Sequence, residues 1–207
     1  MGYILMILMA YLLGCSNMAW YIAKWKKIDL RAGGSGNLGA SNATMMIGWR
    51  AGVLTALHDI EKAVLAVVLA SAVFPQLPYI RQIAGVSCVL GHIFPVFMKF
   101  RGGKGFAAYL GMTAALNWKL ALIVGAAVVL ITLITDYIVW GTFAAVTIVP
   151  LWEGIAARSW TAAVILLIGT VVIVFRHREN ISRILSGKEI GLRSTLRKEH
   201  RADKAKV

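Results

Sequence analysis

The chain has 207 residues, of which 59% are hydrophobic and only 15% are charged, and its formal net charge is +13. Its mean hydropathy of +0.73 lies well outside the balance of a soluble globular domain. These values indicate an integral membrane protein. The positive charge requires no nucleic-acid partner, because basic loops beside anionic lipid account for it.

Seven apolar runs are candidates to cross the roughly 30 Å hydrocarbon core of a bilayer. They cover residues 3–23, 51–74, 79–98, 105–117, 120–135, 137–155 and 160–175. We therefore expect an all-α integral membrane protein with seven transmembrane helices. The whole chain, residues 1–207, is expected to form one domain that ends in a basic tail from about residue 193.

Positive charge predicts the orientation, since cytoplasmic loops are enriched in Lys and Arg. With seven spans, eighteen of the 22 Lys and Arg residues lie on the side of the C-terminus. Only three lie on the other side, namely Arg81, Lys119 and Arg158, and Lys62 falls inside the second span. This asymmetry predicts an outer N-terminus and a cytoplasmic C-terminus.

Three polar motifs fall on the predicted cytoplasmic side. The first is GGSGNLGASN, residues 33–42. Glycines let the backbone approach a ligand closely, and successive N–H groups can bind an anion. A flexible linker would have a similar composition, so this motif alone does not decide. The candidate ligand-binding residues in it are Gly34, Ser35, Gly36, Asn37, Gly39 and Asn42.

The second motif is GHIFPVFMKFRGGKG, residues 91–105. It places Arg101 and Lys104 where a helix is expected to begin, and helix N-termini favour anions. We predict that Lys104 is the main point charge. Upstream, His92 either contacts substrate or only bonds a neighbouring helix. The glycines beside the two cations are Gly102, Gly103 and Gly105.

The third motif is RHRENISRILSGKE, residues 176–189. Its spacing places His177, Asn180 and Arg183 on one face of a helix, because residues three apart are neighbours on the helix surface. Such a helix could close over a phosphate, or it could rest on lipid headgroups. The second reading explains the neighbouring arginines but explains Asn180 poorly.

Charged side chains also occur within the second predicted span. Asp59 and Lys62 have the spacing of a helical ion pair, and charges at this depth usually pair with one another. We expect this pair to support the site rather than to relay protons. The two cysteines, Cys15 and Cys88, lie in apolar runs and indicate neither a disulfide framework nor a metal site.

Cationic glycine loops on one face of a membrane protein indicate a phosphorylated ligand. An enzyme would join a soluble phosphorylated compound to a lipid chain, whereas a transporter would carry a phosphorylated solute across the membrane. Transporters commonly show repeated halves and sites at the bilayer midplane. The sequence shows no convincing repeat and its motifs cluster at one face, which favours the enzyme.

In order and spacing, residues 35–42, 91–105 and 177–189 resemble the three motifs of the bacterial acyl-phosphate:glycerol-3-phosphate acyltransferase family, PlsY. The resemblance implies acyl transfer from acyl phosphate to glycerol 3-phosphate, giving lysophosphatidic acid in phospholipid synthesis. It implies no cofactor, no metal and no obligatory protein partner, and an active site on the cytoplasmic side of the bacterial inner membrane. The catalytic, phosphate-handling residues implied are Ser35, Lys104, His177 and Asn180.

One position departs from the family pattern. Met45 stands where the family has an arginine that helps hold the glycerol phosphate. Losing a planar, permanently charged donor is a large change at a phosphate site. Three explanations stay open: Arg31 or Arg50 supplies the charge, the chain is a paralogue that acylates another acceptor, or it binds lipid without catalysis.

Overall fold

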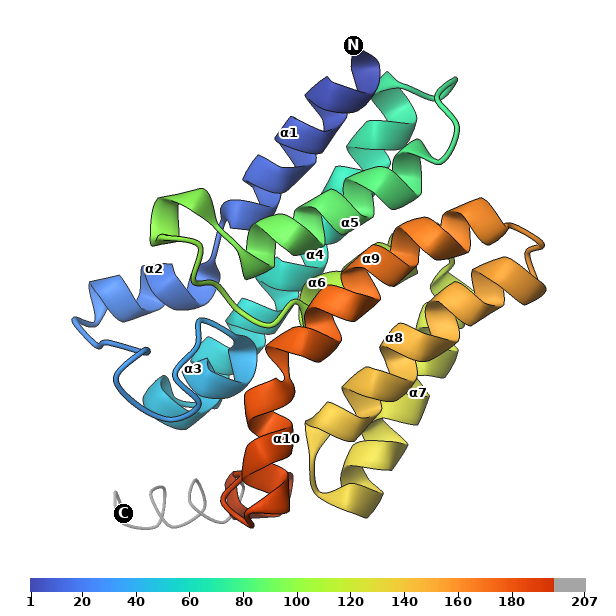
Figure 1. Cartoon of the computed structure of the whole chain (residues 1–207). Helices are drawn as coiled ribbons and strands as arrows, with labels where there is room; N and C mark the ends of the chain where they lie inside the picture. The colour runs from blue at the N-terminus through green and yellow to red at the C-terminus, as the bar shows by residue number, and fades with distance from the viewer. Residues whose placement is uncertain (196–207) are drawn as a thin grey trace.

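The computed structural model describes residues 1–195, and all the regular elements in this part of the chain are helical (Figure 1). The predicted tail from about residue 193 lies mostly outside the described residues. In chain order the elements are α1 (Gly2–Cys15), α2 (Met18–Trp25), α3 (Ala40–Ile47), α4 (Trp49–Val73), α5 (Ile80–Ile93), the 3-10 turn η1 (Val96–Met98), α6 (Phe106–Leu116), α7 (Trp118–Thr135), α8 (Ile138–Ile155), α9 (Trp160–Arg176) and α10 (Arg178–Leu185).

Each of the seven predicted runs contains a helix, but the count of seven spans is corrected to four or five. Among the described residues, the stretches long and apolar enough to cross a membrane are Gly2–Trp25, Ile80–Met98, Trp118–Thr135 and Ile138–Ile155. A fifth is α9 with α10, if this pair, bent by 42°, is one span. With 11 residues α6 is only about 17 Å long. The 25-residue α4 is long enough, but its apolar part carries Asp59, Glu61 and Lys62.

Asparagine marks two of the breaks between helices. Asn17 has an extended backbone between α1 and α2, and its Oδ1 accepts the N–H of Trp20 at 2.9 Å. Asn117 does the same between α6 and α7, where its Oδ1 accepts the N–H of Leu120 at 3.0 Å. Asparagine is a favoured N-cap because its side chain satisfies a free backbone donor of the first turn. Both residues therefore begin a new helix.

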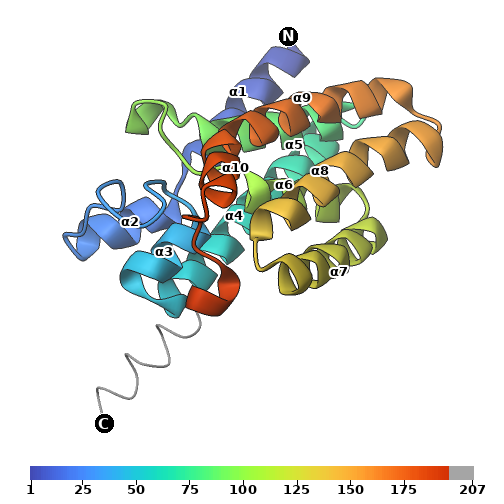
Figure 2. The ribbon, with the colours of Figure 1, turned by 60° about the horizontal axis from the view of Figure 1, so that its bottom comes forward.

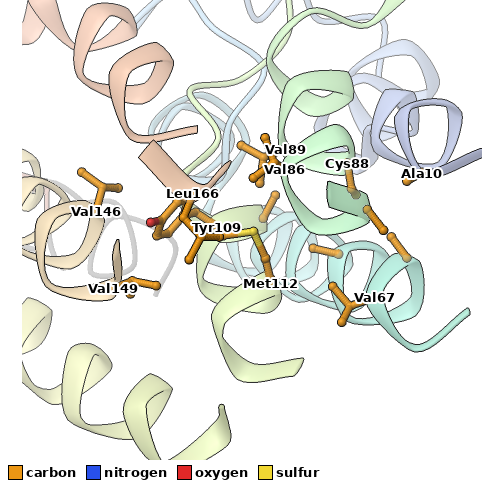
Figure 3. Packing of buried hydrophobic residues seen from close by; sticks show 14 of the residues in the cluster. Ala10, Val67, Val86, Cys88, Val89, Tyr109, Met112, Val146, Val149 and Leu166 are labelled. Atoms are coloured by element: carbon orange, nitrogen blue, oxygen red, sulfur yellow. The ribbon is translucent and has the colours of Figure 1, made fainter. Parts of the chain in front are cut away.

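The core is formed by residues of α1, α4, α5, α6, α7, α8 and α9. Figure 3 shows Tyr109 of α6 grouped with Leu166 of α9, Val146 of α8 and Val86 of α5. Tyr109 and Leu166 are fully buried. Because lipid tails are as apolar as these side chains, close packing rather than removal from water holds this core together.

Glycines bring α1 and α5 into close contact. A Cβ at Gly14 would clash with the backbone carbonyl of Cys88, and a Cβ at Gly91 would clash with that of Tyr11. Small residues at such crossings let membrane helices approach closely. The end of α5, which leads into the second motif, is thereby fixed against α1.

Large apolar side chains are exposed along α7 and α9. Examples on α7 are Leu122, Ile123 and Ile134, and on α9 Val164 and Val171, each with more than half of its surface accessible. Such a surface would favour aggregation in water, whereas it is the expected surface toward lipid tails.

Candidate active site

The three sequence motifs gather at the end of the molecule that carries α2, α3 and α10, away from the N-terminus (Figures 1 and 2). The first motif forms the loop before α3 and the start of that helix, the second ends in the loop before α6, and the third forms α10 and the segment that follows it. Residues from distant parts of the sequence therefore share one region.

Asn42 holds the first loop from behind. It lies in the first turn of α3 and is fully buried. Its Oδ1 accepts the N–H of Ser35 at 2.7 Å, and its Nδ2 donates to the carbonyls of Leu30 at 2.7 Å and Asn37 at 2.9 Å. Gly34, at φ +59°, passes so close that a Cβ would clash with Asn42 Oδ1. Asn42 thus anchors the loop, and its contact with a ligand stays a prediction.

Ser35 and Asn37 are half-buried in this loop, and Gly34 and Gly36 are exposed. Asn37 Nδ2 donates to Ser35 Oγ at 2.8 Å, so the Ser35 hydroxyl keeps its proton for another acceptor. Gly36, at φ +68°, makes the turn between them, and Gly39 is the N-cap residue of α3. The Ser35 hydroxyl is thus a short donor that is free for an anion, whereas the N–H groups of Ser35 and Gly36 already have acceptors.

The second loop is held against the end of α5. The N–H groups of Gly102 and Gly103 donate to the carbonyls of Ile93 at 3.1 Å and His92 at 3.2 Å. A Cβ at Gly103 would meet His92 Nε2 and the carbonyl of Leu38 in the first loop. Only glycine fits at this crossing, so the two loops lie in direct contact.

The two arginines considered as substitutes for the missing charge have other contacts. The Arg31 guanidinium donates to the carbonyl of Arg101 at 2.7 Å and to that of Met98 at 3.1 Å, so it supports the second loop. Arg50 is exposed and stacks on Trp49 at 5.6 Å from the ring centroid. Their positions do not favour the first of the three explanations for Met45.

Lys104 joins the second loop to α10 in a network that contains Asn180 and Arg183. Lys104 Nζ donates to Asn180 Oδ1 at 2.5 Å, and Asn180 Nδ2 donates to Glu189 Oε1 at 2.5 Å. Glu189 Oε2 pairs with Arg183 Nε at 2.6 Å, while Arg183 Nη2 is buried with no partner among the described residues. The two cations, Lys104 and Arg183, are therefore linked through Asn180 and Glu189.

Burial, and after it the nearby charge of Arg183, lowers the pKa of Lys104 to about 8, while Glu189 opposes the shift. The charged ammonium is therefore incompletely compensated by the protein. An anionic ligand beside Nζ would stabilise the charged form, since an opposite charge nearby favours ionisation.

His177 lies at the bend between α9 and α10 and is buried. Its Nδ1 lies 2.8 Å from the carbonyl of Ile173, which can only accept, so Nδ1 carries the hydrogen and Nε2 is left as an acceptor. The edge of the ring packs on Phe143 of α8 at 5.9 Å between centroids. Within residues 1–195, Ser35 and His177 make no hydrogen bond to the Lys104–Asn180 pair.

The predicted Asp59–Lys62 ion pair is present, with 2.7 Å between Nζ and Oδ1, and both side chains are buried. His92 is the third member, because its Nδ1 lies 3.1 Å from Asp59 Oδ1 and 2.9 Å from Lys62 Nζ. Since its other ring nitrogen faces Gly103, His92 supports the second loop from inside the protein.

Glu189 is the residue of the network that sequence reasoning did not include among the site residues. Its carboxylate bridges Asn180 and Arg183, although it follows α10 and lies outside the helical face on which those two residues sit. The one sequence feature that could have indicated Glu189 as a site residue is its position in the third motif. After α10 the chain turns at Gly187, at φ +66°, and this turn brings Glu189 back to Asn180 and Arg183.

Fold and site together define a multi-pass helical membrane protein whose cationic loops meet at one end. Such a site is suited to phosphorylated ligands. The chain belongs to the glycerol-3-phosphate acyltransferase family, whose model matches residues 4–187. This confirms the resemblance seen in the three motifs.

Curated relatives cover nearly the whole chain. The glycerol-3-phosphate acyltransferase of Thermoanaerobacter pseudethanolicus is 36% identical over 187 residues, covering 90% of this chain and 93% of the relative. That of Aquifex aeolicus is 35% identical over 184 residues, covering 89% of this chain and 96% of the relative.

Solved structures of PlsY, an integral membrane glycerol 3-phosphate acyltransferase, have the same fold. Its glycerol 3-phosphate form superposes with a TM-score of 0.87 at 33% identity and covers 93% of this chain and 96% of that one. Its lysophosphatidic acid form gives a TM-score of 0.84 at 32% identity, with coverage of 95% and 99%.

Proposed function

We propose that this chain transfers a fatty acyl group from acyl phosphate to the 1-hydroxyl of glycerol 3-phosphate, giving lysophosphatidic acid and inorganic phosphate. Family membership supports the reaction class, and the solved relatives in glycerol 3-phosphate and lysophosphatidic acid forms support the acceptor and the product. The observation in this chain that carries the proposal is the Lys104–Asn180 pair beside Arg183, which places two cations where loops and α10 meet.

Acyl phosphate is already an activated mixed anhydride, so the main task is to stabilise the phosphate that leaves. In the proposed direct transfer, the glycerol oxygen forms a bond to the acyl carbon while the bond from that carbon to the phosphate oxygen breaks. Lys104 and Arg183 offset the negative charge of the two substrates and of the leaving group. The Ser35 hydroxyl, whose proton is free for another acceptor, is proposed to orient a phosphate.

The proton of the acceptor hydroxyl has two available destinations, Nε2 of His177 and an oxygen of the departing phosphate. The Nδ1 hydrogen bond to Ile173 leaves His177 Nε2 free to accept, as a general base requires. No covalent acyl-enzyme is needed, because the donor is activated before it binds.

The end that carries the motifs is proposed to face the cytoplasm of a bacterial inner membrane. Basic residues support this orientation, because cytoplasmic segments are enriched in them. Those on α2 and the loops at this end are Lys24, Lys26, Lys27, Arg31, Lys99, Arg101 and Lys104.

Restoring the arginine that the family has at position 45 is expected to favour glycerol 3-phosphate. Met45 lies half-buried on α3, the helix that follows the first loop. Met45→Arg should lower the KM for glycerol 3-phosphate by about tenfold, because a charge-assisted bond to phosphate is added. Met45→Gln is the control, since it adds a polar group of similar length without charge. An unchanged KM in Met45→Arg would place the acceptor phosphate elsewhere.

The pH profile is expected to reflect the lowered pKa of Lys104. The group is charged below its pKa of about 8 and loses its charge as the pH rises through that value. Because kcat/KM reports the free enzyme, it should fall above about pH 8 rather than near the pKa of about 10.4 of an ordinary lysine. In Lys104→Arg, any remaining activity should lack this fall, since arginine does not titrate in that range. A wild-type profile flat to pH 10 would contradict the assignment.

An acceptor panel tests the reaction itself. Purified protein is supplied with acyl phosphate and with glycerol 3-phosphate, glycerol or dihydroxyacetone phosphate, and both released phosphate and lipid product are followed. Glycerol 3-phosphate should give the highest kcat/KM. A clear preference for another acceptor would support the paralogue explanation of Met45, and product formation with none of them would refute acyl transfer.

A further inference from the structure

Asn17 lies in the two-residue break between α1 and α2 and is buried, with only 1% of its surface exposed. Its Oδ1 accepts the N–H of Trp20 at 2.9 Å and so begins α2. Its Nδ2 donates to the carbonyl of Leu38, in the middle of the first glycine loop, at 2.9 Å. One side chain therefore fixes a helix start with one atom and a site loop with another.

The break is also bonded to the buried charged cluster. Lys62 Nζ donates to the carbonyl of Ser16, the residue before Asn17, at 2.7 Å, and pairs with Asp59. His92 completes that cluster and packs its ring against Gly103 of the second loop. A continuous buried polar path thus leads from the first loop, through the break, to the second loop.

Leu38 is where the two loops meet. Its carbonyl is the atom that Asn17 binds, and it is also one of the atoms that a Cβ at Gly103 would approach, at 3.2 Å. Asn42 fixes the neighbouring carbonyl of Asn37 from the side of α3, and the N–H of Gly36 donates to the carbonyl of Gly33. The bond from Asn17 supplies a constraint at the crossing itself.

We propose that Asn17 is a positioning residue, which sets the first loop relative to the second through the carbonyl of Leu38. It does not touch substrate. The kinetic part of this inference rests on the proposed function, whereas the structural part does not. Without the Nδ2 donor, the Leu38 carbonyl would lose its buried partner and the loop would shift to find another. Ser35 and Asn37 would shift with it.

Asn117 provides a matched control for the capping role. It begins α7 through the same Oδ1 bond, to the N–H of Leu120 at 3.0 Å. It lies at the far end of α6 from Lys104 and is not bonded to a glycine loop in the described part of the chain. Serine is a good N-cap but is too short to reach Leu38. Asn17→Ser and Asn117→Ser therefore both keep a cap, and only the first loses the bond to the loop.

The test measures acyl transfer, thermal unfolding in detergent and amide hydrogen exchange of residues 33–42 for both variants. Asn17→Ser should lower kcat/KM by roughly 10- to 100-fold, as small misplacements of binding groups do. It should also speed exchange in residues 33–42. Asn117→Ser should stay within about twofold of wild type, as a substitution away from the site does.

Three results would overturn the inference: wild-type kinetics in Asn17→Ser, equal kinetic losses in both variants, or unchanged exchange in residues 33–42. If wild-type protein itself transferred no acyl group, the proposed function would fail instead. The exchange measurement would then still decide whether Asn17 holds the loop.

Discussion

Replacing Lys104 with alanine is expected to lower acyl transfer by at least about 10²- to 10³-fold, the loss seen when one group that stabilises developing charge is removed. Lys104 donates to Asn180 and lies beside Arg183, so its removal takes one of two cations from the site. It also breaks the link between the second loop and α10. The measurement is phosphate release by purified protein at saturating acyl phosphate.

Lys119→Ala is the matched control for this loss. Lys119 is exposed at the start of α7 and lies over the ring of Trp118, 5.7 Å from its centroid. The same truncation there should leave the rate within about twofold of wild type. A near-normal rate in folded Lys104→Ala would remove Lys104 from the site and with it the observation on which the proposed function depends.

Replacing Asp59 with alanine is expected to lower the free energy of unfolding by about 3–5 kcal/mol, the usual cost of removing one partner of a buried ion pair. Asp59 faces both Lys62 at 2.7 Å and His92 at 3.1 Å, and all three side chains are buried. Without the carboxylate, the ammonium of Lys62 would be left in the protein interior without its counter-charge. Unfolding in mixed detergent micelles measures the change.

Glu61→Ala serves as the control on the same helix. Glu61 is exposed, two residues from Asp59, and should change the free energy of unfolding by less than about 0.5 kcal/mol. Equal effects of the two substitutions would show that the buried cluster contributes no more than a surface charge.

The helices could be located from the sequence better than the number of membrane crossings. Apolar runs marked every long helix, because a chain that faces lipid must keep its apolar residues together. The sequence placed a separate run at residues 105–117, and the structure has a helix of 11 residues there, too short for a span, because Asn117 begins a new helix. The sequence paired Asp59 with Lys62 inside the second run, but their further partners, His92 and the carbonyl of Ser16, come from other segments.

The motifs were located correctly at one end of the molecule, but the function of individual side chains within the fold was not evident from spacing alone. The i, i+3 pair of Asp59 and Lys62 is a local property of a helix, so it could be predicted. The contact of His92 with that pair and the burial of Asn42 depend on how distant segments pack. Glu189 and Asn17 were missed for the same reason, because their partners lie 9 and 21 residues away along the chain.

The most direct test of the proposed function is the stoichiometry of products from purified protein given acyl phosphate and glycerol 3-phosphate. One lysophosphatidic acid should form for each phosphate released, and omission of glycerol 3-phosphate should abolish lipid formation. Uptake of glycerol 3-phosphate into proteoliposomes without acyl phosphate, with no lysophosphatidic acid formed, would contradict the account and indicate a transporter.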